Sequence, residues 1–205
     1  MCGRYNIITD PQALIDGFSV AILPFDINCF EVIEECFPGQ NLPVIRQTEA
    51  GRELTLMRWG LIPHWSKTEK QKYSTINARS ETILDKPTYR NSFLHKRCII
   101  PATGFFEWSG SKGNKRKYYI SDGNNSLMAF AGLWDCWKSE DKIIESFTII
   151  TTNANEEVGL IPQRMPVILG GDEVDQWLRL DGVTPQENMA ILKPFHKHGL
   201  DIVAL

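Results

Sequence analysis

Residues 97–108 read "RCIIPATGFFEW", and this stretch decides the fold class. It is rich in β-branched and aromatic residues, which favour strands, and three similar stretches follow it at 116–121, 126–135 and 145–152. Clusters of Gly, Asn, Asp and Ser, such as "SGSKGN" and "DGNNS", separate them and are typical of turns. Because short connections favour antiparallel neighbours, this part of the chain predicts an antiparallel sheet.

The residues before this stretch add a hairpin and a helix. Residues 41–47 and 53–60 are strand-like, and the turn-like "TEAGR" joins them, so we expect a β-hairpin. Asp10 is a helix-capping residue and Pro11 suits the first helical position, so a helix is expected to begin near residue 11 and to lie outside a sheet.

Helical patterns recur between and after the strands. Residues 78–97 are partly helical but are interrupted by Pro87, and residues 172–180 and 184–192 have helical spacing. At this length the chain can bury one well-formed core. We therefore predict an α+β protein, a single domain over residues 1–205, with a mainly antiparallel, barrel-like β-sheet core and flanking helices.

Composition points to an ordinary cytoplasmic protein. The chain is 42% apolar and 23% charged, and no stretch approaches the roughly 20 apolar residues that cross a bilayer, so no membrane partner is expected. The first residues lack a secretory pattern. No CxxC pair suggests zinc, and neither a metal nor another cofactor is expected. Reduced thiols are expected at all five cysteines: Cys2, Cys29, Cys36, Cys98 and Cys136.

Charge is unevenly distributed along the chain. The net charge of −3 alone argues against a nucleic-acid partner, but residues 52–97 carry ten basic side chains against four acidic ones. This block is either an ordinary solvated face or a surface that holds a polyanion. Its basic residues are Arg52, Arg58, Lys67, Lys70, Lys72, Arg79, Lys86, Arg90, Lys96 and Arg97.

Cys2 is the first candidate for chemistry. Removal of Met1 leaves Cys2 with a free amine of pKa about 7.7–8.0 beside a thiol of pKa about 8.5, both reference values. Such an aminothiol can close a five-membered thiazolidine ring on an aldehyde. It can also act as an N-terminal nucleophile in acyl transfer. A third interpretation is that this cysteine is merely a small second residue.

Three further segments combine polar groups with apolar surroundings. In an extended "STINARSET", Asn77 and Arg79 point to the same side, and Glu107 ends an apolar strand among aromatic residues that can raise its pKa. Gln163 and Arg164 form a polar break before another strand. Each residue also has an ordinary structural interpretation, as a turn cap, an ion-pair partner or a solvated strand end.

Eight segments, in order, resemble the SOS-response-associated peptidase (SRAP) family, whose members covalently shield abasic sites in single-stranded DNA. The match runs from residue 2 to about residue 180, and eight ordered motifs are highly specific. The motifs are "MCGRY", "MRWGLIPHWSK", "INARSET", "KPTYRNSF", "RCIIPATGFFEW", "FAGLWD", "TIITTNAN" and "RMPVIL".

The resemblance implies that Met1 is removed and that Cys2 forms a thiazolidine with the ring-opened sugar aldehyde. It implies that Asn77 hydrogen-bonds the adduct or the sugar hydroxyl, and that Glu107 moves protons. It also implies DNA contacts by Gly3 and by basic and aromatic residues, the candidates being Arg4, Arg79, Arg164, Trp65 and Trp108.

The chain departs from the family pattern in three places. Most members carry a histidine where Gln163 stands, and glutamine cannot transfer a proton near neutral pH. We therefore expect slow reversal of the adduct. Whether this chain also cleaves the strand as a lyase is left open by the same substitution. Residues 34–41, "EECFPGQN", replace a segment expected to contact DNA; Cys36 within it is interpreted as a buried small apolar residue. The chain stops at "GLDIVAL", so its C-terminal end could be truncated.

Three functions follow from the sequence. The first is a monomeric, cytoplasmic protein that crosslinks to abasic sites in single-stranded DNA and is nucleoid-associated when bound. The second is an N-terminal cysteine amidohydrolase, or a peptidase that removes its own Met1. The third is a non-catalytic single-strand binder.

Overall fold

The computed structural model describes residues 2–26, 32–111, 113–122, 126–195 and 199–205. The helices within these ranges are α1 (Pro11–Phe18), α2 (Pro87–His95), α3 (Gly171–Leu178) and α4 (Pro185–Ala190), together with a 3₁₀ turn, Ser80–Thr82. The strands are β1 (Tyr5–Ile7), β2 (Val20–Ile22), β3 (Ile33–Cys36), β4 (Asn41–Thr48), β5 (Gly51–Trp59), β6 (Asn77–Arg79), β7 (Arg97–Ala102), β8 (Gly104–Ser111), β9 (Asn114–Ser121), β10 (Met128–Lys138), β11 (Ile143–Asn153), β12 (Arg164–Pro166), β13 (Ile168–Leu169) and β14 (Asp201–Ala204).

A closed ring of five strands forms the barrel. Strand β4 pairs with β5 and β7, β10 pairs with β7 and β11, and a parallel pairing of β11 with β5 closes the ring. The closing register places Ser146 opposite Arg58 and Phe147 opposite Trp59. Strands β12 and β6 extend the sheet along β11, so residues distant in sequence lie on one surface.

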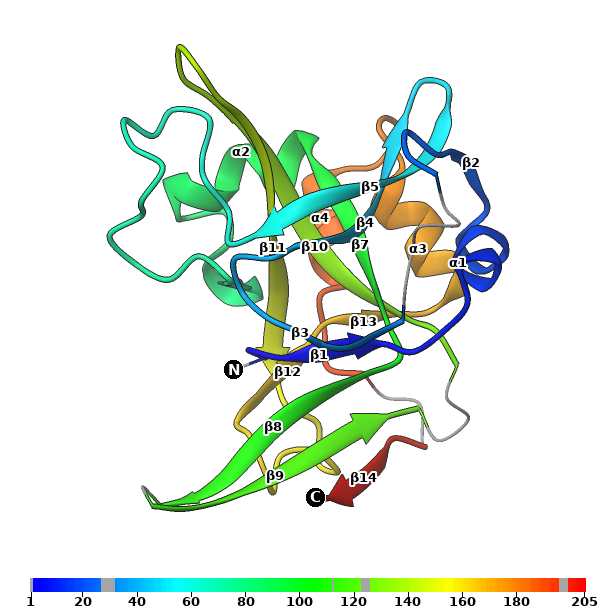
Figure 1. Cartoon of the computed structure of the whole chain (residues 1–205), viewed down its shortest axis with the longest axis vertical. Helices are drawn as coiled ribbons and strands as arrows, with labels where there is room; N and C mark the ends of the chain where they lie inside the picture. Colours follow the sequence, from blue (N-terminus) through cyan, green and yellow to red (C-terminus); the bar gives the residue numbers. More distant parts are fainter. Residues whose placement is uncertain (1, 27–31, 112, 123–125, 196–198) are drawn as a thin grey trace.

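A second sheet, in the order β14-β9-β8-β1-β3, packs against the barrel. In Figure 1 it occupies the lower part of the molecule, and its β8–β9 hairpin projects away from the barrel. Aromatic rings join the two sheets: Tyr5 of β1 meets Trp59 at 5.2 Å and Phe130 at 6.2 Å between ring centroids, and Phe105 of β8 meets Phe130 at 6.0 Å. All four side chains are buried, so the N-terminal strand is fixed by the core.

Local sequence signals account for the helices. The Asp10 carboxylate accepts a hydrogen bond from the Ala13 amide at 2.9 Å, and Pro11 begins α1, as predicted. Pro87 begins α2 and so separates it from the 3₁₀ turn, which explains the interrupted helical pattern.

The predicted hairpin of residues 41–47 and 53–60 is confirmed as β4 and β5. The α+β class, with a mainly antiparallel barrel-like core and flanking helices, is also confirmed. Within the part of the chain that the structure describes, three strand pairings are parallel, β11–β5, β11–β6 and β2–β5. Among the described residues, no helix has the length and apolar character needed to span a membrane.

Gly132 of β10 tests how tightly the barrel is packed. A Cβ atom at this position would lie 2.1 Å from the Ile100 Cδ1 atom and 2.9 Å from the Thr148 carbonyl oxygen. We therefore expect Gly132→Ala to lower the free energy of unfolding by about 1–3 kcal/mol, measured by urea denaturation.

Gly171→Ala is the matched control, because a Cβ atom there meets nothing within 4 Å. It should change the free energy of unfolding by no more than about 0.5 kcal/mol. Equal effects of the two substitutions would show that the barrel interior is not close-packed at Gly132.

Candidate active site and nucleic-acid interface

The candidate site forms where β1, β6 and β8 approach Cys2. Cys2 is fully buried and precedes β1, which pairs with β8. The Asn77 Nδ2 group, on β6, donates a hydrogen bond to the Cys2 carbonyl oxygen at 2.8 Å. The structure thus brings together two predicted catalytic residues that lie 75 positions apart in the sequence.

Asn77 is held from two sides. Its strand runs parallel to β11, with Asn77 opposite Ile149, and the Tyr89 hydroxyl of α2 donates a hydrogen bond to the Asn77 carbonyl oxygen at 3.1 Å. Burial raises the pKa of Tyr89 to about 12, so this hydroxyl remains a donor at neutral pH. The Asn77 Oδ1 atom is buried and accepts no hydrogen bond from the described residues. It is therefore available to accept one from a ligand.

Glu107 of β8 provides the titratable group of the site. Its side chain is only 5% exposed, and burial raises the pKa of its carboxyl. Burial and, next, the charge of Glu107 raise the pKa of the Cys2 thiol. Glu107 therefore lies close enough to influence the ionisation of Cys2, and at neutral pH the buried thiol is protonated.

Two other described cysteines, Cys36 and Cys98, are buried in the core near β1. Cys36 lies opposite Tyr5 in the β1–β3 pairing, and burial raises its pKa to about 12. Cys98, on β7, is also fully buried. The interpretation of Cys36 as a buried small residue is confirmed, whereas Cys29 lies outside the described residues.

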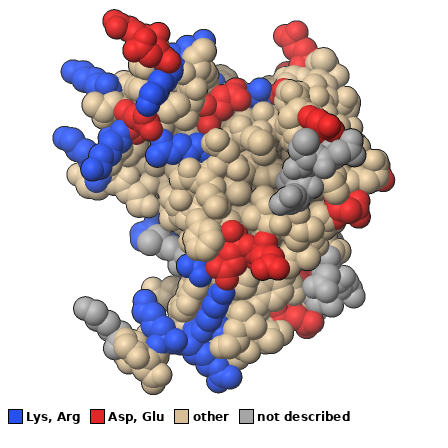
Figure 2. Space-filling view, in the orientation of Figure 1, with Lys and Arg blue, Asp and Glu red and all other residues tan. Residues whose placement is uncertain are grey.

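A pocket of about 780 Å³ opens beside Asn77 and carries much of the basic block. Five of the ten basic residues of positions 52–97 line it, together with the exposed aromatic side chains of Trp65 and Tyr73. These five residues are Lys67, Lys70, Lys72, Arg79 and Lys86. Figure 2 shows Lys and Arg side chains gathered on this part of the molecule, at the upper left of the view.

Four of the five other basic residues of the block have structural partners, and one of them, Arg52, pairs with Asp175. Arg97 donates to backbone carbonyl oxygens, including that of Trp177, while Lys96 pairs with Asp135 at 2.5 Å. Arg58 pairs with Glu69. Only part of the block therefore forms the basic surface that the sequence suggested.

The loop that carries Trp65 is anchored on both sides by β10. Asp135 accepts hydrogen bonds from the His64 amide at 2.8 Å and the His64 ring Nδ1 at 2.9 Å, and the Trp137 indole donates to the Ser66 carbonyl oxygen at 2.8 Å. Trp65 is 55% exposed between these two anchors. Burial opposes ionisation of Asp135, but hydrogen bonds from Lys96 and His64 outweigh it and lower the Asp135 pKa.

Arg4 and Trp108 lie together, on the opposite face of β8 from Glu107. The Arg4 guanidinium is 5.0 Å from the Trp108 ring centroid and 4.5 Å from that of Phe37. It also pairs with Glu35 at 2.9 Å. Arg4 is thus held by an acidic partner. Gly3, which stands between Cys2 and Arg4 in the sequence, is half-buried. DNA contacts by Gly3, Arg4 and Trp108 stay predictions.

Arg79 and Arg164 lie on strands that flank β11. Arg79 is exposed and lines the pocket. Arg164 pairs with Glu81 at 2.9 Å and donates to the Thr151 carbonyl oxygen at 2.7 Å, so its side chain is largely occupied. Gln163 is exposed, and its carbonyl oxygen accepts from the Ala154 amide at 3.0 Å.

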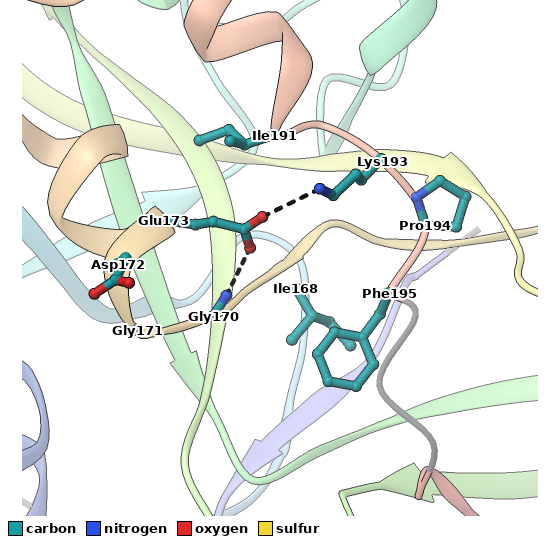
Figure 3. Close-up of a pocket in the computed structure, with 9 residues that line it drawn as sticks. All are labelled: Ile168, Gly170, Gly171, Asp172, Glu173, Ile191, Lys193, Pro194 and Phe195. Carbon is teal, nitrogen blue, oxygen red and sulfur yellow. Dashed lines mark hydrogen bonds and ion pairs between the residues drawn. The ribbon is translucent and has the colours of Figure 1, made fainter.

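A separate pocket of about 400 Å³ lies at the start of α3. Figure 3 shows Glu173 reaching both the Gly170 amide, at 2.9 Å, and the Lys193 Nζ atom, at 3.6 Å. The carboxylate therefore already caps this helix, and the pocket includes no predicted site residue. Among the described residues, no cluster of three or more His, Cys, Asp or Glu is arranged to hold a metal.

Sequence reasoning missed Tyr89, Tyr73 and Asp135 as parts of this site. Asp135 could have been found, because a carboxylate within the apolar strand "FAGLWD" requires buried partners. Tyr89 gave no comparable signal, since its contact with Asn77 depends on the position of α2.

Comparisons with known proteins identify the family and support the fold. The sequence model described as SOS response associated peptidase (SRAP) matches residues 1–205. The abasic site processing protein YoaM of Bacillus subtilis is 37% identical over 197 residues, which cover 95% of this chain and 86% of that protein. The abasic site processing protein HMCES of Gallus gallus is 36% identical over 168 residues, 70% of this chain and 50% of that protein.

A crystal structure of a protein from Bacteroides thetaiotaomicron superimposes with a TM-score of 0.88 at 28% identity, covering 100% of this chain and 92% of that chain. The similarities in sequence and in fold thus extend over nearly the whole length. The chain belongs to the SOS response associated peptidase (SRAP) family.

Proposed function

We propose that this protein binds abasic sites in single-stranded DNA and forms a covalent adduct through the amine and thiol of Cys2, which protects the lesion. The observation that carries the proposal is the contact with the Cys2 backbone of Asn77, which also lines a basic pocket with exposed aromatic residues. Relatives named abasic site processing proteins support the same substrate.

The proposed chemistry begins after hydrolysis of the Met1–Cys2 peptide bond, which frees the Cys2 amine. The amine attacks the C1′ aldehyde of the ring-opened sugar, and loss of water gives an imine. The thiol then adds to the imine carbon and its proton passes to the nitrogen, which closes a thiazolidine. The whole sequence joins protein and DNA with loss of one water, and it needs no oxidant or cofactor.

Glu107 is suited to the proton transfers of these steps. Its raised pKa allows the carboxyl to be protonated at higher pH than an ordinary glutamate, so it can donate a proton as the sugar ring opens and as water leaves. The carboxylate that remains can accept the proton of the Cys2 thiol. This second step matters because burial and Glu107 itself raise the pKa of that thiol.

The polar groups around Cys2 fit a sugar, and the pocket fits a polyanion. The buried Asn77 Oδ1 atom can accept a hydrogen bond from a sugar hydroxyl. The lysines of the pocket can neutralise phosphates, while Trp65 and Tyr73 offer faces for base stacking. Backbone contacts and stacking are largely independent of sequence, so sequence preference should be low.

The other two functions fit the site less well. An amidohydrolase needs a pocket for the acyl group of a small amide, whereas the pocket beside Asn77 is lined with lysines. A non-covalent binder does not require Cys2, Asn77 and Glu107 to be brought together. We propose that the peptidase activity of this protein is the removal of its own Met1. We also propose that the protein acts as a monomer in the cytoplasm, on the DNA of the nucleoid.

Replacement of Cys2 tests the proposal directly. Wild-type protein lacking Met1 should give a heat-stable, shifted band on a denaturing gel with a single strand that contains one abasic site. Cys2→Ala should give no such band, because its amine can form only an imine, which a borohydride reductant is needed to trap. Cys136→Ser, which removes a partly exposed thiol, should retain the band. A stable adduct formed by Cys2→Ala would overturn the proposal.

Glu107→Gln should slow crosslinking about 100-fold, since it removes proton transfer but keeps the shape of the side chain. If protonated Glu107 is the proton donor, the plot of the wild-type crosslinking rate against pH has a descending limb, in which the rate falls as Glu107 loses its proton. Because burial raises the Glu107 pKa, this limb lies at higher pH than it would for an ordinary glutamate. Glu107→Gln should lack this limb. Time courses on denaturing gels across pH measure it, with Glu34→Gln, an exposed carboxyl on β3, as control. An unchanged rate and limb in Glu107→Gln would contradict the role.

Gln163→His should accelerate reversal of the adduct at least about tenfold, because histidine can transfer protons near neutral pH and glutamine cannot. Release of the oligonucleotide from purified crosslink, with excess competing aldehyde present, measures the rate. Gln163→Asn is the control and should reverse as slowly as the wild type. If reversal by Gln163→His is no faster, the slow reversal has another cause.

A further inference from the structure

The β8–β9 hairpin has two chemically different faces. Strand register places Glu107 opposite Tyr118 and Ser109 opposite Arg116, and directly opposed residues of an antiparallel pair share a face. From the core outward, the pairs on this face are Phe105 with Ile120, Glu107 with Tyr118, and Ser109 with Arg116. The first pair is fully buried and Arg116 is exposed, so Glu107 lies where this face leaves the core.

Arg116 and Tyr118 form a pair on the same face as Glu107. The Arg116 guanidinium lies 5.8 Å from the Tyr118 ring centroid, which confirms that both side chains point to one side of β9. Tyr118 is half-buried and Arg116 is exposed. An aromatic ring with an adjacent guanidinium is the combination that contacts a nucleotide, by stacking on its base and by binding its phosphate.

The opposite face of the hairpin is occupied differently. Lys117 lies 4.2 Å from the Phe106 ring centroid and also pairs with Glu35, and Phe106 contacts Tyr119 at 5.2 Å. Lys115 belongs to this second face, opposite Gly110, and it is exposed. Among the residues of the hairpin that the structure describes, exposed cations lie on both faces, and Arg116 is the one on the face that Glu107 shares.

Cys2 lies between this hairpin and the basic pocket. On one side it contacts Asn77, which lines the pocket. On the other side, the Phe106 amide of the hairpin donates a hydrogen bond at 2.9 Å to the carbonyl oxygen of Arg4, two residues after Cys2. Figure 2 shows basic side chains on both the upper lobe and the lower hairpin, with a hollow between them at the left of the view. In Figure 1, β1 begins on this same side of the molecule, between the upper lobe and the hairpin. A strand whose lesion reaches Cys2 thus has one flank toward each surface.

We propose that Arg116 and Tyr118 bind the single-stranded flank on the side of the lesion opposite to the flank held by the lysine pocket. This inference rests on the proposed function and adds a second, separate contact surface for the same DNA. Arg116 binds a backbone phosphate, and Tyr118 stacks with a base. The two flanks are therefore held by different parts of the fold.

The test uses oligonucleotides with a tetrahydrofuran analogue of the abasic site, which has no aldehyde and binds without crosslinking. Three probes carry about six thymidines on the 5′ side, on the 3′ side or on both sides. Arg116→Ala and Tyr118→Ala should each weaken binding of the two-sided probe roughly tenfold. They should weaken only one of the one-sided probes. Lys67→Ala combined with Lys70→Ala should weaken the other.

Salt dependence separates the two roles. Loss of one phosphate contact in Arg116→Ala should reduce the slope of log affinity against log salt by about 0.7 for a single strand, whereas Tyr118→Ala should leave the slope unchanged. Tyr118→Phe keeps the ring and should bind like the wild type, which also excludes a folding defect as the cause. Lys115→Ala removes an equal charge from the other face and should have no effect on either one-sided probe.

Two results would overturn this inference. One is an equal loss of affinity in Lys115→Ala and Arg116→Ala, which would indicate a diffuse charge effect. The other is loss of the same flank in the hairpin and lysine-pocket variants. Crosslinking of the wild type to a true abasic strand is assayed in parallel. A normal crosslink with no flank-specific loss refutes only the hairpin contact, whereas absence of any crosslink refutes the proposed function itself.

Discussion

The packing of Tyr5 between the two sheets is the constraint on which the site depends. Its ring contacts Trp59 and Phe130 of the barrel, and this contact holds the N-terminal strand only three residues after Cys2. A chain terminus usually gains mobility from its lack of neighbours, but here the core fixes the following strand. The hydrogen bond from Asn77 then orients the Cys2 carbonyl. A terminal aminothiol can thus be presented in a fixed geometry.

The same burial sets the chemistry of the site. It raises the pKa of both the Glu107 carboxyl and the Cys2 thiol, so both groups bind their protons more tightly than an exposed carboxyl and an exposed thiol do. Outside this buried centre the charges are balanced in pairs. Arg4 is held by Glu35 and Arg164 by Glu81, so a phosphate would have to compete with these carboxylates, whereas the lysines of the pocket are available on the surface.

Local rules predicted the longer strands and the helices, but neither the short strands, such as β1 and β3, nor how distant elements meet. The cap of α1 and the β4–β5 hairpin follow from short sequence patterns. Closure of the barrel does not, because the parallel pairing of β11 with β5 joins residues such as Phe147 and Trp59 that lie far apart in the sequence. For the same reason the ion pair of Arg4 with Glu35, which the β1–β3 pairing brings about, could not be read from local patterns, and the contact of Arg4 with a phosphate stays a prediction. The family resemblance supplied the grouping of Cys2 with Asn77, which local patterns alone left open.

The central claim is that the amine and the thiol of Cys2 react together with one aldehyde. The intact mass of the crosslinked complex, followed by peptide mapping, tests this most directly. The account predicts the mass of the protein without Met1 plus that of the abasic strand, less one water, with the DNA attached at Cys2. It also predicts that borohydride treatment leaves this mass unchanged, whereas an imine formed by the amine alone would be reduced and would gain hydrogen. An adduct that retains Met1, or one attached at any other residue, would contradict it.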